Sequence, residues 1–100
     1  MPKITIDVAH ALGQEKAVER LKEQFPSIRD AFQEKLTSLE ETWNAHVATF
    51  RLVTQGVTVT GTVTLDPSVA RVDVQLPLVA MLLKGKIESR IRQRLGEILG

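Results

Sequence analysis

The sequence contains no cysteine, which excludes disulfide bonds and thiolate chemistry and favours a reducing, intracellular setting. Histidine is nearly as rare, since His10 and His46 are the only two and they lack the close spacing of metal ligands. No serine stands in a G-x-S-x-G context, and there is no glycine-rich phosphate loop. The acidic residues are dispersed among lysines and arginines. We therefore expect no enzyme activity, no metal site and no cofactor.

The net charge is also small, and the apolar runs are short. A formal net charge of +1 gives no general attraction to nucleic acid. The longest apolar run, Leu78–Leu83, is far shorter than the roughly 20 residues that span a bilayer, and the alternating N-terminus does not resemble a signal peptide. With 100 residues, of which 43% are hydrophobic, the chain is expected to form one globular α+β domain over residues 1–100 in the cytoplasm.

The first half of the chain predicts a strand followed by a long helix. Residues 3–8 alternate strictly, which is typical of a half-buried strand. Gly13 is a plausible N-cap, and apolar residues then recur at spacings of three and four, which predicts an amphipathic helix. These residues are Val18, Leu21, Phe25, Ile28, Phe32, Leu36 and Leu39. Pro26 removes a backbone donor, so the helix is expected to be kinked or broken there.

The second half predicts three strands and a final helix. Residues 43–53 favour a strand, but their alternation slips, and a bulge near Val47 or Ala48 would reconcile it. After a tight turn at Gln55-Gly56, residues 57–65 alternate between inward valines and outward threonines. A further strand is predicted over residues 69–76, and Pro77 suits the first position of a helix that continues to Gly100.

The predicted order is therefore β-α-β-β-β-α, an α+β fold with a four-stranded antiparallel sheet. The last three strands form a meander, and the first strand most simply pairs antiparallel with the fourth, which gives the spatial order 2-3-4-1. Because each strand has a single apolar parity, both helices are expected to cover one face of the sheet. The outward threonines Thr58, Thr60, Thr62 and Thr64 are then read as the solvated side of a strand rather than a ligand surface.

Four short motifs point to a family. They are Met1-Pro2-Lys3-Ile4-Thr5-Ile6, then His10-Ala11-Leu12-Gly13-Gln14-Glu15-Lys16-Ala17, then Gly56-Val57-Thr58-Val59-Thr60-Gly61-Thr62-Val63, and finally Leu76-Pro77-Leu78 with Lys84-Gly85-Lys86-Ile87-Glu88. In these motifs the chain resembles the small bacterial polyhydroxyalkanoic acid system proteins, also called polyhydroxyalkanoate granule-region proteins. The resemblance is weakest over residues 26–54. It implies a cytoplasmic bacterial protein near polyester storage granules, whose hydrophobic polymer is coated with amphiphiles, and it carries no catalytic motif.

The final helix carries the main functional hypothesis. At 100° per residue, Ala80, Leu83, Ile87, Ile91, Leu95 and Ile98 fall in one sheet-facing arc. Leu78 and Leu82 then point away from the sheet and are followed by a strip of small residues, while five scattered cations can cover apolar surface with their stems. The candidate interaction residues are Leu78, Met81, Leu82, Gly85, Lys86, Ser89, Arg90 and Arg92.

Three interpretations of the outward leucines stay open at this point. They could form a homodimer or partner-protein interface, or they could dock with the cations on an amphiphile-coated granule or an anionic membrane. Alternatively, the segment around Trp43 or the first helix simply covers them. A different function, binding of a small acyl or hydroxyacyl ligand, would need a pocket between the sheet and the final helix. Its predicted lining is Trp43, Phe50, Leu83 and Ile87.

Overall fold

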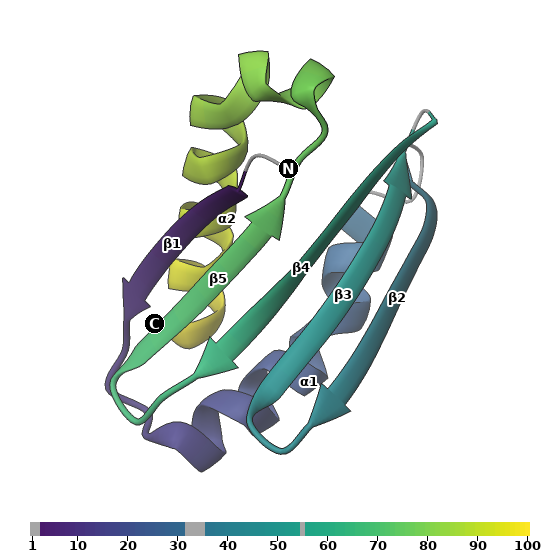
Figure 1. The fold of residues 1–100 in the computed structure, drawn as a ribbon. Coiled ribbons are helices and arrows are strands. Elements are labelled where there is room, and N and C mark those ends of the chain that lie inside the picture. The colour runs from purple at the N-terminus through teal and green to yellow at the C-terminus, as the bar shows by residue number, and fades with distance from the viewer. Residues whose placement is uncertain (1–2, 32–35, 55) are drawn as a thin grey trace.

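The structure is a computed structural model that describes residues 3–31, 36–54 and 56–100 (Figure 1). Its elements follow in the order β1 (Lys3–Ala9), α1 (Gln14–Ala31), β2 (Leu36–Asn44), β3 (Val47–Thr54), β4 (Val57–Leu65), β5 (Val69–Gln75), the 3-10 helix η1 (Leu78–Leu83) and α2 (Lys84–Leu99). The predicted α+β class is confirmed. The strands at residues 3–8, 57–65 and 69–76 are also confirmed to within one residue at their ends.

The strands form one antiparallel sheet in the order β1-β5-β4-β3-β2. The predicted pairing of the first strand with the last is confirmed, with Ile4 opposite Val74 and Ile6 opposite Val72. The prediction of four strands is wrong, because β2 adds a fifth strand beside β3. The sheet therefore ends in two edge strands, β1 and β2.

The additional strand occupies residues that were predicted to continue the first helix. Helix α1 ends at Ala31, and Leu36 and Leu39 belong to β2, whereas Phe32 lies outside the described residues. A spacing of three fits a helix, but the segment also contains threonine and tryptophan, which favour strands. Leu39 lies opposite Leu52 in β3, and this cross-strand partner is what the sequence pattern could not supply.

Two further local predictions are corrected in this region. The predicted bulge near Val47 or Ala48 is replaced by a turn, in which Ala45 has φ 55 and Asn44 pairs with Val47. The register shift of β2 and β3 instead lies between Leu36 and Ser38. Trp43 is consequently the second-last residue of β2.

Helix α1 continues through Pro26, so the predicted alternative of two separate helices is wrong. Proline leaves the carbonyl group four residues earlier without its helical partner. Pro26 is exposed, and water can reach this side of the helix. Phe25, directly before the proline, keeps the apolar register of the helix and is buried with Ala17 and Leu21 against the sheet.

The predicted continuous C-terminal helix is wrong in its first turns. Pro77 is extended, with φ −65 and ψ 156, and the six residues of η1 form a 3-10 helix before α2 begins at Lys84. A 3-10 helix advances by three residues per turn, so a projection at 3.6 residues per turn misplaces side chains there. Leu83, which was predicted to face the sheet, is 55% exposed.

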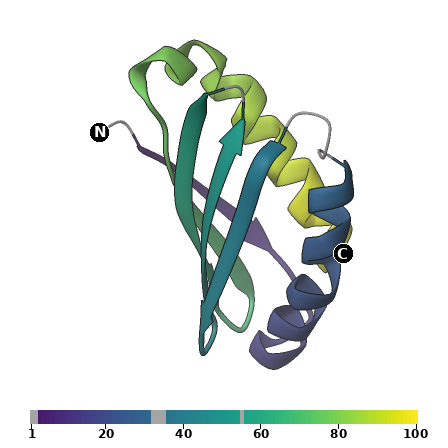
Figure 2. The ribbon, with the colours of Figure 1, turned by 90° about the vertical axis from the view of Figure 1, so that its right-hand side faces the viewer.

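Both helices lie on the same face of the sheet, as the edge-on view shows (Figure 2). In Figure 1, α2 runs behind β1 and β5, and α1 runs behind β3 and β2. The core between the layers is formed by β1, β3, β4, β5, α1, Leu76 and the C-terminal end of α2. Its largest fully buried side chains are Ile6, Leu21, Leu65, Leu76, Val72 and Val74. Among the described residues, no helix lies over the opposite face of the sheet (Figure 2), which carries mainly polar side chains.

Candidate functional site

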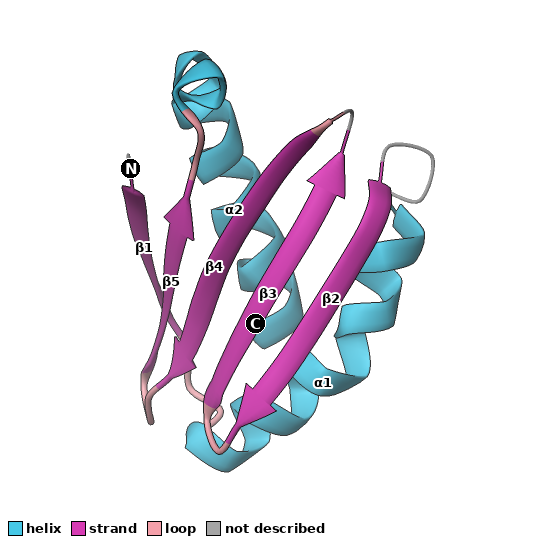
Figure 3. Ribbon diagram, turned by 45° about the vertical axis from the view of Figure 1, so that its right-hand side comes forward, coloured by secondary structure: helices cyan, strands magenta, loops and turns pink. Residues whose placement is uncertain are grey.

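Three large apolar side chains of η1 are exposed to solvent. Leu78, Leu82 and Leu83 are 78%, 91% and 55% exposed, and we call them the leucine surface. They lie beyond the end of β5, where η1 projects from the upper end of the molecule (Figures 1 and 3). The prediction that Leu78 and Leu82 point away from the sheet is consistent with these values. No described residue covers them, so the interpretation in which the Trp43 segment or α1 covers them is wrong for the described chain.

The 3-10 helix is anchored on the core by only part of its residues. Ala80 and Met81 pack against the buried cluster, and the Ala80 N–H donates to the Pro77 carbonyl at 2.9 Å. Burying one leucine side chain stabilises a protein by about 1.5–3 kcal/mol. The three leucines of the leucine surface do not contribute this stabilisation to the fold, because they stay exposed. An exposed apolar cluster of this kind is typical of a contact surface.

Positive charge directly follows the leucine surface. Lys84 and Lys86 lie in the first turn of α2, which contains no acidic residue and has no side-chain cap. Both lysines and Arg90 are exposed. Because the N-terminus of a helix is the positive end of its dipole, lysines there raise the local positive potential further. This end of the molecule is therefore apolar and carries two lysines that form no ion pair with any described residue.

The candidate interaction residues divide into two groups. Gly85, Lys86, Ser89 and Arg90 are exposed, as are Leu78 and Leu82. Met81 packs against the core, and Arg92 is engaged in the fold. Arg92 Nη1 donates to the Asp7 carbonyl at 3.0 Å, and Arg92 Nη2 lies 3.6 Å from Glu88 Oε1.

The four residues predicted to line a pocket are not brought together. Trp43 lies beside the β2–β3 turn, where its Nε1 donates to Glu41 Oε2 at 2.9 Å and Lys22 Nζ is 5.1 Å from its ring centroid. Leu83 is at the other end of the sheet, on η1 (Figure 1). Phe50 and Ile87 pack against the core from β3 and α2.

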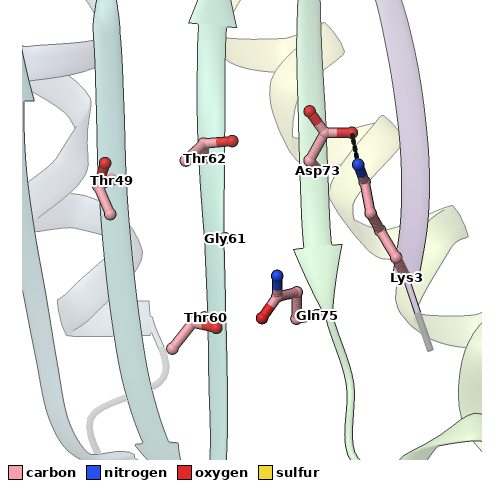
Figure 4. A pocket seen from close by; sticks show the side chains of 7 residues that line it. All are labelled: Lys3, Thr49, Thr60, Gly61, Thr62, Asp73 and Gln75. Carbon is pink, nitrogen blue, oxygen red and sulfur yellow. Dashed lines mark ion pairs between the residues drawn. The ribbon is translucent and has the colours of Figure 1, made fainter. Parts of the chain in front are cut away.

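A shallow hollow of about 310 Å³ lies instead on the uncovered face of the sheet (Figure 4). Its lining residues are Lys3, Thr49, Thr60, Gly61, Thr62, Asp73 and Gln75. The charge of Asp73 is already matched, because Lys3 Nζ lies 3.7 Å from Asp73 Oδ1 and the Thr5 hydroxyl donates to the same oxygen at 2.8 Å. The hollow is open and holds no unmatched charge in the described chain, so the threonines there fit the predicted solvated strand face.

A smaller hollow of about 170 Å³ lies between the two helices, lined by Arg20, Gln24, Arg94, Glu97 and Ile98. Arg20 Nη1 donates to the Ile98 carbonyl at 3.2 Å, and Arg94 Nη1 lies 3.4 Å from Glu97 Oε2. Within the described residues, no three histidine or acidic side chains are grouped closely enough to hold a metal ion. Among the described helices, none is both long and apolar enough to cross a bilayer.

Comparison with protein families matches residues 4–99 to the family described as "Putative polyhydroxyalkanoic acid system protein". The chain belongs to this family. The resemblance seen in the sequence motifs is thereby confirmed over nearly the whole chain. Searches of curated proteins and of solved structures gave no significant match.

The motif at residues 10–17, which resembles the opening of the polyhydroxyalkanoic acid system family, has a structural role here. The His10 imidazole accepts the Leu12 N–H at Nδ1, at 3.2 Å, and its Nε2 donates to the Asp66 carbonyl at 3.0 Å. The Gln14 amide donates to the Leu65 carbonyl at 2.9 Å. These bonds join the start of α1 to the β4–β5 turn. The role of Gln14 was missed from sequence, because its partner lies 51 residues away.

Proposed function

We propose that this chain is a non-enzymatic accessory protein of polyhydroxyalkanoate storage in the bacterial cytoplasm, and that it docks on the granule surface through its leucine surface. The family supplies the link to polyhydroxyalkanoate. The observation that carries the proposal is the exposure of Leu78, Leu82 and Leu83 at one end of an otherwise well-buried fold. A polyester granule is an apolar body on which such side chains gain by leaving water.

The size of the leucine surface favours a granule over a second copy of the chain. At about 25 cal/mol per Å² and 1.5–3 kcal/mol per leucine, three leucines bury roughly 200–350 Å². A stable protein interface buries about 800 Å² on each partner. A homodimer would therefore need much more surface than the leucines provide, whereas an anchor on a continuous apolar surface needs no matching partner surface. Light scattering after size-exclusion chromatography separates these cases, and we expect a monomer.

Sedimentation with isolated granules tests the proposal. The double variant Leu78→Ser with Leu82→Ser removes the two most exposed leucines, which together contribute roughly 3–6 kcal/mol when buried. We expect the wild-type chain to sediment with granules and the variant to bind at least a hundredfold more weakly. Because both side chains are exposed, the unfolding temperature should stay within about 2 °C of wild type. Equal sedimentation of the folded variant and the wild type would contradict the proposal.

A further inference from the structure

We infer that the leucine surface, together with Lys84, Lys86 and Arg90, recognises the anionic phospholipid headgroups of a lipid layer. This inference rests on the proposed function, because it names the chemistry of the surface on which the leucine surface docks. It commits to a lipid layer as the occupant, with bare polymer or a coat protein as the competing outcomes.

The three cations are not used by the fold. Among the described residues, no ion pair or side-chain hydrogen bond involves Lys84, Lys86 or Arg90. The other two cations of α2 differ, because Arg92 bonds to β1 and Arg94 pairs with Glu97. The nearest acid on α2, Glu88, lies beside Arg92. The cations next to the leucine surface are therefore the ones that remain available to an external anion.

The positions of the three cations make their local electrostatic energy unfavourable, and a bound anion would lower that energy. Lys84 and Lys86 lie in the first turn of α2, where the helix dipole disfavours cations. Lys86 and Arg90 are four residues apart and so lie on the same side of α2, where like charges repel. An anionic surface offsets both terms, whereas a neutral apolar surface offsets neither. Charge complementarity thus favours a phospholipid layer over bare polymer.

The geometry fits the depth of a lipid interface. The exposed leucines belong to η1. This short helix lies at the tip of the molecule, and α2 leads away from that tip (Figure 3). With a rise of about 1.5 Å per residue, the distance along α2 from Lys84 to Arg90 is about 9 Å. Apolar groups of peripheral proteins enter the headgroup and acyl boundary to a depth of about 5–10 Å. The cations then lie at the level of the phosphates while the leucines contact acyl chains.

Vesicle sedimentation tests this inference on the full chain. The probes are vesicles of phosphatidylcholine alone and of phosphatidylcholine mixed with phosphatidylglycerol. We expect binding to the mixed vesicles that weakens as salt is raised. Each lysine near an anionic surface contributes about 1 kcal/mol, so Lys84→Gln with Lys86→Gln should weaken this binding roughly thirtyfold. The charge-matched control Lys16→Gln with Arg51→Gln, at exposed positions of α1 and β3, should lose far less.

The outcomes separate the two proposals. Binding to mixed vesicles that falls with the lysine variant and not with the control supports the inference. If the wild type sediments with granules but not with anionic vesicles, the inference fails and the proposed function stands. Equal binding to both vesicle types, or equal loss in variant and control, also overturns the inference. If neither granules nor vesicles bind the chain, both proposals fail.

Discussion

At the scale of single residues, Gly61 leaves room for the ring of Phe50 on the inner face of the sheet. The two residues are cross-strand partners in β4 and β3. A Cβ atom at Gly61 would lie 2.6 Å from Phe50 Cζ and 2.5 Å from the Asp73 carbonyl oxygen. Such contacts are shorter than real Cβ atoms make, and the backbone oxygen cannot turn aside as a side chain can. The glycine is therefore required by packing on two neighbouring strands.

We predict that Gly61→Ala lowers the free energy of unfolding by about 1–3 kcal/mol, because overpacking displaces Phe50 or β5. Urea unfolding followed by circular dichroism measures the change. Gly96→Ala in α2 is the matched control, since nothing lies within 4 Å of its Cβ position. That control should raise stability by about 0.5–1 kcal/mol, as alanine favours a helix. Equal effects of the two substitutions would show that the close contacts at Gly61 carry no cost.

At the scale of elements, each edge strand of the sheet receives an arginine from a helix. Arg92 of α2 donates to the Asp7 carbonyl of β1 at 3.0 Å, and Arg29 of α1 donates to the Leu39 carbonyl of β2 at 3.1 Å. Edge strands otherwise present free backbone groups that pair with other chains. The arginines occupy part of these edges and bring a charge to each. Association of this chain by strand addition is thereby disfavoured.

The double variant Arg29→Ala with Arg92→Ala should aggregate at protein concentrations at which the wild type stays monodisperse. Loss of the two hydrogen bonds should also lower stability by roughly 1–3 kcal/mol in total. Dynamic light scattering during prolonged incubation measures the first effect. Arg51→Ala is the control, because Arg51 is an exposed residue of the inner strand β3. Unchanged light scattering of the double variant would mean that other features protect the edges.

Helix α1 contains a proline that the fold tolerates without an evident gain. Pro26→Ala restores one backbone donor in an exposed part of the helix. We predict an increase in the free energy of unfolding of about 1–3 kcal/mol, since proline disfavours a helix interior by about 3 kcal/mol. Thermal and urea unfolding measure it. Pro67→Ala, in the turn between β4 and β5, should give no such increase, and a loss of stability in Pro26→Ala would point to a required kink.

At the scale of the whole molecule, the two ends of the fold have different characters. The molecule measures 36 × 23 × 23 Å, and it is elongated. One end carries the leucine surface and the three available cations, while the loop before α1 and the β4–β5 turn meet at the other end (Figure 1). If the molecule docks by this tip, the uncovered face of the sheet does not contact the granule and stays in water.

Much of this architecture is determined by the sequence itself. Alternation in residues 3–8, 57–65 and 69–76 specifies the buried face of β1, β4 and β5, because side chains of a strand point to opposite faces with a period of two. The antiparallel pairing of the first and last strands was predicted as the simplest arrangement, and the register of β1 with β5 confirms it. The orientation of Leu78 and Leu82 also follows from an excess of apolar residues over what one buried face can hold.

The remaining features were decided by the tertiary structure, because they depend on which strands pair and on which type of helix forms. The spacing of three between Leu36 and Leu39 fits a helix, and a strand forms there because β3 lies beside it and the register shifts between Leu36 and Ser38. The exposure of Leu83 depends on a 3-10 turn after Pro77, which the 3.6-residue period does not reveal. Whether a cation is available or engaged depends on partners far along the chain: Arg92 reaches β1, 85 residues away, while Lys84 and Lys86 meet no acid in the first turn of α2.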